Sequence, residues 1–336
     1  MPCPSLTELP PPPPGKSGWP WTEQTPPASR RDWPRITVVT PTFNQGPFIE
    51  ETIRSVLLQG HPNLEYIIMD GGSTDQTVDI IKKYERWLAY WVSEKDRGQA
   101  HAINKGWARA TGDILAWINS DDWYLPGALQ TVSEHFFTKP QSMWIAGVVE
   151  NSHSPKNVLK HFLPRPTSLT QCLGRSNYGF HQPGMFWRRN LVEAVGPLDE
   201  TLHFCFDHDF FIRTLQRQVE QDCLRAHLAG FRLHPDSKSC SRLPRFLKED
   251  WLVFERYEHA LSPVEAAKAR RWLSEYEAES WLTFTYHLLA NHQRWEALRH
   301  LFSKLPVLSH LKPPRLMLGA FYRTLISGKP PAWFHS

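Results

Sequence analysis

The sequence predicts an α/β protein whose sheet is mostly parallel and flanked by helices. Between residues 36 and 118, short runs of β-branched or apolar residues alternate with stretches in which apolar residues recur at helical spacing. Such strict alternation is typical of a parallel sheet wound by right-handed crossovers. Polar residues follow the predicted strands, and open α/β sheets bind their ligands at that edge.

Local signals place each expected element in chain order. β-branched residues predict a strand at 36–40, and a helix is expected between Pro47 and Gly60, where apolar residues recur at helical spacing. Further strands are expected at 64–69, 88–92, 114–118, 143–149 and 224–233. Further helices are expected after Asp75, between Gln99 and Thr111, at 127–137, at 190–195 and from Asp207. The pattern is regular up to residue 149 and looser beyond it.

Three regions are predicted along the chain. Residues 1–35 form an arm rich in proline and tryptophan, which either packs on the body or remains a flexible leader. Residues 36–240 carry the strands and helices described above, and residues 241–336 are expected to form a helical C-terminal extension. The helices expected in that extension are 245–260, 263–291, 293–303 and 313–326.

The composition is that of a globular protein and argues against several functional classes. The 336 residues are 41% hydrophobic and 21% charged, enough for one large or two modest domains. A net charge of +4, without basic runs interleaved with aromatic residues, is too weak to indicate nucleic-acid binding. Five scattered cysteines without a CxxC spacing favour a reducing compartment. With no apolar leader and no run of about 18 apolar residues, a cytoplasmic protein without a transmembrane segment is expected.

Two adjacent carboxylates, Asp121 and Asp122, follow the expected strand at 114–118. Neighbouring carboxylates repel each other, so such a pair is most useful where a divalent cation bridges it to an anion such as a diphosphate. The alternative is a helix N-cap, because Asp122 precedes Pro126 and an expected helix. Three polar loops converge on the same sheet edge and favour a functional site; these are 42–46, 70–75 and 119–122.

The chain resembles the family 2 glycosyltransferases of the GT-A fold over roughly residues 36–240. The motifs that carry this resemblance occur in the family's order and spacing, at 38–44, 70–75, 104–106, 111–113, 119–122, 182–183, 186–189, Gly196 and 207–209. The resemblance implies a Rossmann-like GT-A sheet. It also implies a nucleotide-binding half at 36–125 and an acceptor half at 126–240.

The resemblance implies an enzyme that transfers a sugar from a nucleoside diphosphate sugar with inversion at the anomeric carbon. The expected sugar is a hexosyl or N-acetylhexosaminyl group, UDP is the favoured nucleotide, and Mn²⁺ or Mg²⁺ is the implied cofactor. The expected acceptor is a hydroxyl of a glycan or lipid-linked molecule in surface polysaccharide synthesis. The alternative is a non-catalytic GT-A-like scaffold that binds nucleotide or glycan. Asn119 favours that alternative, because it replaces the first acid of the family's DxD motif.

The resemblance also assigns roles to single residues. Asp121 matches the second acid of the DxD motif and is expected to bind the metal, and His234, at a predicted strand end, is a further candidate ligand. Asp207 matches the catalytic base, with a carboxylate that favours the helix start as the alternative. Asp122 is expected to support the site or cap a helix, and Asp209 to be structural. The expected contacts to the nucleotide sugar are Pro41, Thr42, Asn44, Asp70, Asp96, Arg97, Asn119, Ser120 and Asp121.

The acceptor side is less defined. Trp123, Phe186 and Trp187 are candidates for stacking on a sugar ring, and core packing is the alternative, favoured for Phe186 and Trp187. The C-terminal helices carry basic residues among leucines. We expect them to cover the sheet or form a dimer contact. Peripheral association with the inner face of a membrane, near a lipid-linked acceptor, is the alternative.

Overall fold

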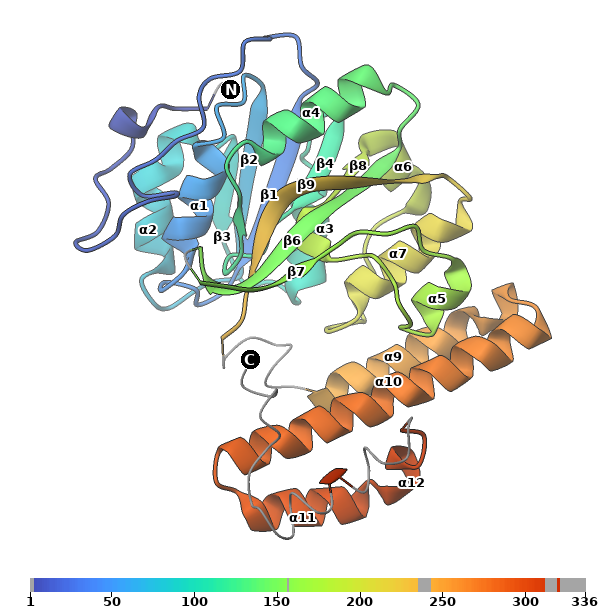
Figure 1. Cartoon of the computed structure of the whole chain (residues 1–336). Helices are drawn as coiled ribbons and strands as arrows, with labels where there is room; N and C mark the ends of the chain where they lie inside the picture. Colours follow the sequence, from blue (N-terminus) through green and yellow to red (C-terminus); the bar gives the residue numbers. More distant parts are fainter. Residues whose placement is uncertain (1–2, 156, 235–242, 312–318, 321–336) are drawn as a thin grey trace. The chain divides into compact units, whose positions relative to one another are not determined.

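The computed structural model describes residues 3–155, 157–234, 243–311 and 319–320. The chain divides into two compact units, and each is described by itself. The first unit comprises residues 1–167 and 179–234 and holds the sheet; the second comprises residues 168–178 and 235–336 and is helical in its described part (Figure 1).

Nine strands of the described chain form one sheet, with the order β3-β2-β1-β4-β8-β6-β9-β5 and β7 paired to β6. The strands are β1 (Ile36–Thr42), β2 (Leu64–Asp70), β3 (Tyr90–Ser93), β4 (Ile114–Trp117), β5 (Trp123–Tyr124), β6 (Trp144–Ser154), β7 (Asn157–Phe162), β8 (Met185–Arg188) and β9 (Gln221–Arg232). The first four strands in chain order pair in parallel. From β8 onward the sheet is mixed, because β8 runs antiparallel to both β4 and β6 whereas β9 is parallel to β6. The predicted α/β fold is confirmed.

Helices cover both faces of the parallel half of the sheet. Those of the first unit are α1 (Ile49–Leu57), α2 (Thr77–Tyr84), α3 (Gln99–Trp107), α4 (Ala128–Thr138), α6 (Arg189–Val195) and α7 (Phe206–Gln216). Val38 of β1 belongs to the same apolar cluster as Ile53 of α1. The next residue, Val39, faces the other side and meets α3 at Gly106, where an added Cβ would lie 2.5 Å from Val39 Cγ1. Glycine at this position therefore lets α3 lie close to the sheet.

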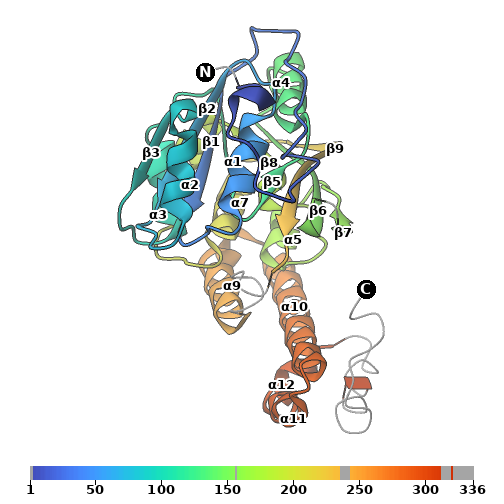
Figure 2. The same cartoon turned by 90° about the vertical axis from the view of Figure 1, so that its left-hand side faces the viewer.

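The N-terminal arm packs on the first unit and passes over α1 (Figures 1 and 2). The guanidinium of Arg54 is fully buried and donates hydrogen bonds to the backbone carbonyls of Pro10, Pro20 and Trp21. Trp19 is buried as well, and its indole N–H donates to the carbonyl of Tyr124 over 2.8 Å. Of the two predicted arrangements, the structure contains the packed arm. Its carbonyls satisfy the charge of Arg54, which would be costly to bury alone.

The second unit consists of α5 (Leu169–Leu173), α9 (Leu243–Tyr257), α10 (Pro263–Ala290), α11 (Arg294–Ser303) and α12 (Leu305–Leu308). Its α5 segment is tied to α9, because Arg175 pairs with the fully buried carboxylate of Asp250. The helix expected at 313–326 lies outside the described residues except for 319–320. In the part of the chain that the structure describes, no helix is long and apolar enough to cross a membrane.

Candidate functional site

The polar loops that follow β1 and β2 are hydrogen bonded to each other at one edge of the sheet. The register pairs Thr42 with Asp70, so both strands end at the same level. The amide of Asn44 donates to Ser73 Oγ over 2.7 Å, and the Asn44 side-chain oxygen accepts from the amide of Thr74 over 2.9 Å. The predicted convergence of these two loops is therefore present in the structure.

Asp70, expected to contact the nucleotide, is buried and accepts hydrogen bonds from the loop that follows β2. One carboxylate oxygen accepts from the amides of Gly72 and Ser73, over 3.1 and 2.9 Å, and from Ser93 Oγ. The other oxygen accepts from Ser73 Oγ. These four hydrogen bonds hold the loop in one shape, and such bonds to a carboxylate are stronger than neutral ones.

Around Asn119 the structure places a network of amide side chains. Gln99, the first residue of α3, donates to Asn119 Oδ1 over 2.7 Å. The Asn119 amide nitrogen donates in turn to Asp122 Oδ2 over 3.2 Å and to Gln182 Oε1 over 3.4 Å. Gln182 also donates to the carbonyl of Trp117 at the end of β4 over 2.7 Å. Asn119 therefore supplies a donor to a buried carboxylate, which an aspartate at the same position would instead repel.

Asp122 does not cap α4, because Gly127 occupies the N-cap position. Asp122 is 1% exposed, and its carboxylate accepts from the backbone amide of Arg232 over 2.9 Å. Burial, with a further contribution from the negative charge of Asp121, raises the pKa of Asp122 well above its usual range. Asp122 therefore supports the loop through its hydrogen bonds to Arg232 and Asn119, which agrees with the first of its two predicted roles.

Asp121 and His234 are in contact although they are far apart in the sequence. Asp121 Oδ2 lies 3.0 Å from His234 Nε2. The other ring nitrogen of His234, Nδ1, is buried and has no hydrogen-bond partner among the described residues. The ring of Phe48 packs against the imidazole at 4.7 Å between centroids. The structure thus brings together the two side chains that the sequence nominated as metal ligands.

Arg232, which the sequence did not single out, holds the backbone of Asp121 and the side chain of Asp122. Its Nε donates to the carbonyl of Asp121 over 2.8 Å and its Nη1 to the carbonyl of His153 over 2.9 Å. The remaining nitrogen lies 3.2 Å from Glu51 Oε2. The only sequence signal was a basic residue near the end of a predicted strand, two positions before His234.

Asp207 occupies the first turn of α7, and Phe210 of that helix packs against Trp117, the last residue of β4. Phe210, one turn later, contacts Trp117 at 6.4 Å and Trp187 at 5.6 Å between ring centroids. Asp207 is partly exposed, and its carboxylate accepts from the amide of His208 over 2.7 Å. Asp209, by contrast, is fully buried and pairs with Arg213 at 2.8 Å. Two acids in one helical turn thus have different environments.

The remaining candidates for contact with the nucleotide sugar differ in how far their polar groups are already paired. Pro41 lies inside β1, and Ser120 is buried. The hydroxyl of Thr42 is buried without a partner in the described chain. Asp96 accepts from the amide of Gly98 over 2.8 Å, and Arg97 pairs with Glu200, with Nε 3.1 Å from Oε2.

The prediction that Trp123 stacks on a sugar ring is wrong, and core packing holds for all three aromatic candidates. Trp123, Phe186 and Trp187 are each 0% exposed. Trp187 stacks on Trp117 at 5.2 Å, and Trp123 packs on the backbone of β9 at Gly230, where an added Cβ would lie 2.1 Å from its ring. Trp123 and Phe186 belong to the apolar cluster on one face of the sheet, whereas Trp187 packs with Trp117 and Phe210 on the other face.

Comparison with known proteins identifies relatives of this chain. Residues 37–196 match the family described as Glycosyl transferase family 2. The chain is 34% identical over 142 residues to the putative teichuronic acid biosynthesis glycosyltransferase TuaG of Bacillus subtilis, covering 41% of this chain and 55% of TuaG. It is 30% identical over 182 residues to the uncharacterized glycosyltransferase Rv1514c of Mycobacterium tuberculosis, covering 54% of this chain and 68% of that protein. The chain thus spans little more than half the length of TuaG.

Solved structures share the fold at low sequence identity. The 1–349 fragment of Staphylococcus aureus TarS superposes with a TM-score of 0.56 at 17% identity, covering 87% of this chain and 81% of the fragment. The mannosyltransferase PcManGT from Pyrobaculum calidifontis, solved with GDP-Man and Mn²⁺, gives a TM-score of 0.56 at 18% identity, covering 93% of this chain and 91% of that one. Together with the sequence matches, this fold shows that the chain belongs to the family 2 glycosyltransferases.

Proposed function

We propose that this protein is a metal-dependent inverting glycosyltransferase that uses a nucleoside diphosphate sugar as donor. Its acceptor would be a hydroxyl of a glycan or lipid-linked molecule, and the transferred group a hexosyl or N-acetylhexosaminyl residue. Residues 36–125 would bind the nucleotide and residues 126–240 the acceptor, with 241–336 as a helical extension. The observation that carries this proposal is the contact between Asp121 and His234 at the sheet edge where the polar loops converge.

The residues at this edge fit a divalent cation. A carboxylate and an imidazole approach each other at 3.0 Å, and the imidazole keeps one buried nitrogen without a partner in the described chain. Oxygen and imidazole donors suit Mn²⁺, and the hard carboxylate suits Mg²⁺ as well. Asp121 and His234 would hold the ion, which would neutralise charge on the leaving diphosphate.

The other residues would position the donor and accept a proton. The β1 and β2 loops, held together by Asn44, Ser73 and Asp70, would form the wall that receives the nucleotide. Asp207 would accept the proton of the acceptor hydroxyl, because this residue is partly exposed at the start of α7. Attack from that side, opposite the leaving diphosphate, would invert the anomeric carbon.

Relatives support the choice of donor and pathway. TarS has been solved with UDP and with UDP-GlcNAc, and PcManGT with GDP-Man and Mn²⁺. TuaG is named for teichuronic acid biosynthesis, which supports a role in surface polysaccharide synthesis. We favour UDP as the nucleotide and treat GDP as the competitor that a direct test must separate from it. The site of action we propose is the cytoplasm or the inner face of a membrane.

A thermal-shift screen tests the proposed donor. UDP, GDP, dTDP, CMP and their common sugar conjugates would each be added with Mn²⁺ and with EDTA. A ligand at 100 times its dissociation constant should stabilise the fold by about 2.7 kcal/mol. The proposal expects a shift with one nucleotide that requires Mn²⁺. No shift with any nucleotide would support the scaffold alternative, for which Asn119 in place of an acid is the specific observation.

A further inference from the structure

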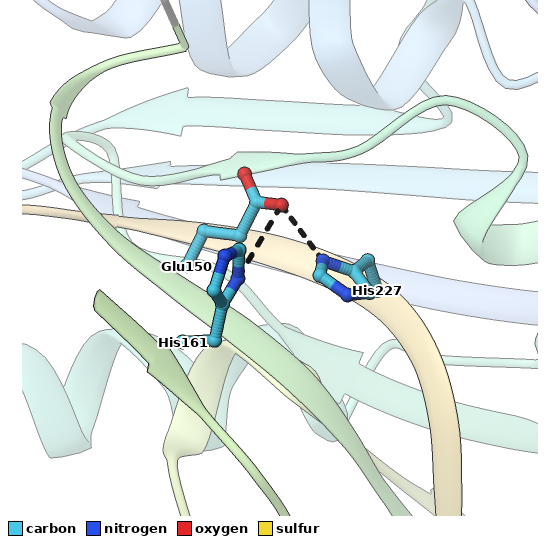
Figure 3. A group of neighbouring side chains, drawn as sticks. All are labelled: Glu150, His161 and His227. Carbon is cyan, nitrogen blue, oxygen red and sulfur yellow. Dashed lines mark hydrogen bonds and ion pairs between the residues drawn. The ribbon is translucent and has the colours of Figure 1, made fainter. Parts of the chain in front are cut away.

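A cluster of two histidines and one glutamate lies on the sheet outside the residues assigned to the donor. Glu150 comes from β6, His161 from β7 and His227 from β9, and their side chains converge (Figure 3). His227 Nδ1 lies 2.7 Å from Glu150 Oε1, and His161 Nδ1 lies 3.9 Å from the same oxygen. One ligand atom from each residue falls within 4.8 Å of the other two.

The strand pairing holds these three residues together. Glu150 and His161 are direct partners in the antiparallel pair of β6 and β7, so their side chains lie on one face. On the other side of β6, the ladder with β9 is irregular between Val148 and Val149, and His227 pairs with Val148. Val148 and Glu150 are two residues apart on β6 and share a face, so His227 lies on the same face as Glu150, which the hydrogen bond between them shows directly.

The exposure of the three side chains leaves the cluster open to an ion from solvent. The Glu150 side chain is 14% exposed, whereas those of His161 and His227 are 50% and 46% exposed. The two rings meet edge to face, 5.0 Å apart at an angle of 71°. The carboxylate is thus mostly covered, whereas both imidazole rings are about half exposed and lie outside the packed core.

We propose that Glu150, His161 and His227 bind Zn²⁺. Zinc takes nitrogen and carboxylate ligands at about 2.0–2.2 Å, which sets tetrahedral ligand atoms about 3.3 Å apart. The observed spacings of 2.7 and 3.9 Å bracket that value, so small side-chain rotations convert the cluster into three ligands of a tetrahedron. Water would fill the fourth position.

The donor set separates this site from the one proposed for the sugar nucleotide. Two imidazoles and one carboxylate favour Zn²⁺ over Mg²⁺, whereas Asp121 and His234 would share their ion with the oxygens of a diphosphate. The zinc site requires no nucleotide. Its consequence is structural: the ion would link β7 to β9 across β6, and β7 pairs with β6 alone among the described strands.

Zinc titration of the purified 336-residue chain, treated with EDTA and then exchanged into chelator-free buffer, tests the proposal. Isothermal calorimetry would compare the wild type with His161→Ala, His227→Ala and Glu150→Gln. His259→Ala is the matched control, because His259 is exposed and lies in the helical unit. Asp121→Asn reports any zinc held at the donor site. We expect each cluster variant to bind Zn²⁺ at least about tenfold more weakly, with His259→Ala and Asp121→Asn retaining the cluster's zinc affinity.

Hydrogen exchange gives a second readout that does not depend on activity. Zinc should slow amide exchange in β7 in the wild type and leave it unchanged in His161→Ala, whose half-exposed side chain can be truncated without opening the core. A wild type that binds no zinc would overturn the proposal. Cluster variants that bind zinc as tightly as the wild type would also overturn it. The same holds if Asp121→Asn loses zinc binding together with the cluster variants.

Discussion

Asp70, at the end of β2, and Asp121, in the loop after β4, differ in how fully their carboxylates are hydrogen bonded. The carboxylate of Asp70 accepts four hydrogen bonds from its own loop and from Ser93. Among the described residues, the carboxylate of Asp121 is hydrogen bonded to His234 alone. Since both loops follow strands in the parallel half of the sheet, the fold itself does not account for the difference.

His61 and His234 also differ in how fully their ring nitrogens are hydrogen bonded. His61 is fully buried, with Nε2 2.7 Å from Ser133 Oγ and Nδ1 accepting from the amide of Asn63 over 3.1 Å. His234 has Nε2 on Asp121 and a buried Nδ1 without a partner in the described chain. A polar group whose hydrogen bonds are complete shapes the protein, whereas one left incomplete at a loop edge is suited to a ligand.

The largest expected effect comes from a residue outside both loops. If the loops bind the donor and Asp207 carries out proton transfer, Asp207→Asn should lower the transfer rate by about 10² to 10⁴-fold, because an amide cannot act as a base. Nucleotide affinity should stay unchanged. Radiolabelled sugar transfer and calorimetry would measure the two quantities.

Asp209→Asn is the matched control for that variant. Asp209 lies two residues away but is buried against Arg213. Asp209→Asn should therefore lower the melting temperature and have little effect on the transfer rate per folded molecule. Near-normal turnover by Asp207→Asn would remove the assigned base.

Asp70→Asn should weaken the fold itself. The substitution replaces an oxygen that accepts hydrogen bonds with an NH₂ group that faces donors, so the free energy of unfolding should fall by about 2–3 kcal/mol. Urea denaturation measures this change. An equally stable Asp70→Asn protein would show that the β2 loop does not depend on its carboxylate, and the comparison with Asp121 would fail.

His61 predicts a pH dependence that His61→Gln should reduce. Burial lowers the pKa of His61 to about 4, below the ordinary value of about 6.5 expected in the unfolded chain. Between these values the unfolded state binds the extra proton, so stability falls as the pH drops from 6.5 to 4. Between pH 7 and pH 5 the expected loss is about 1–2 kcal/mol. Urea titrations of the wild type and His61→Gln across that range would give the same change of unfolding free energy with pH if His61 were not responsible.

Asn119→Asp restores the acid of the family's motif and tests what the amide does. A carboxylate there would lose the hydrogen bond to Asp122 and face a second buried acid, so we expect a loss of about 1 kcal/mol in stability. Asn119→Ala removes the same donor without adding charge and serves as the reference. If Asn119→Asp were more stable than Asn119→Ala, repulsion from Asp122 would not explain the asparagine.

Local sequence patterns predicted the parallel half of the fold and the convergence of its loops, because strand and helix periodicity is read within a few residues. They missed β5, β7, β8 and α5. β5 is two residues long and exists through pairing of Trp123 with Gly230, more than a hundred positions away. The same long-range pairing buries Trp123, which is why a sugar-stacking role was wrongly predicted for it.

The candidate site could also be predicted only in part, because local motifs can be read from the sequence and long-range contacts cannot. The β4 loop and the α7 acids lie in contiguous motifs, whereas Arg232 acts on Asp121 and Asp122 through contacts that only the folded β9 creates. Gln99 likewise gains its partner, Asn119, from the packing of α3 beside β4. Hydrogen bonds between distant segments leave no periodic signal in the sequence.

Calorimetric titration of UDP, or of the nucleotide chosen by the thermal-shift screen, tests the central claim most directly. It would be run in Mn²⁺ and in EDTA on the wild type and Asp121→Asn. We predict that Mn²⁺ tightens binding to the wild type by at least about tenfold and that Asp121→Asn loses this gain while keeping the affinity seen in EDTA. An equal gain from Mn²⁺ in both proteins would contradict the assignment of the cation to Asp121.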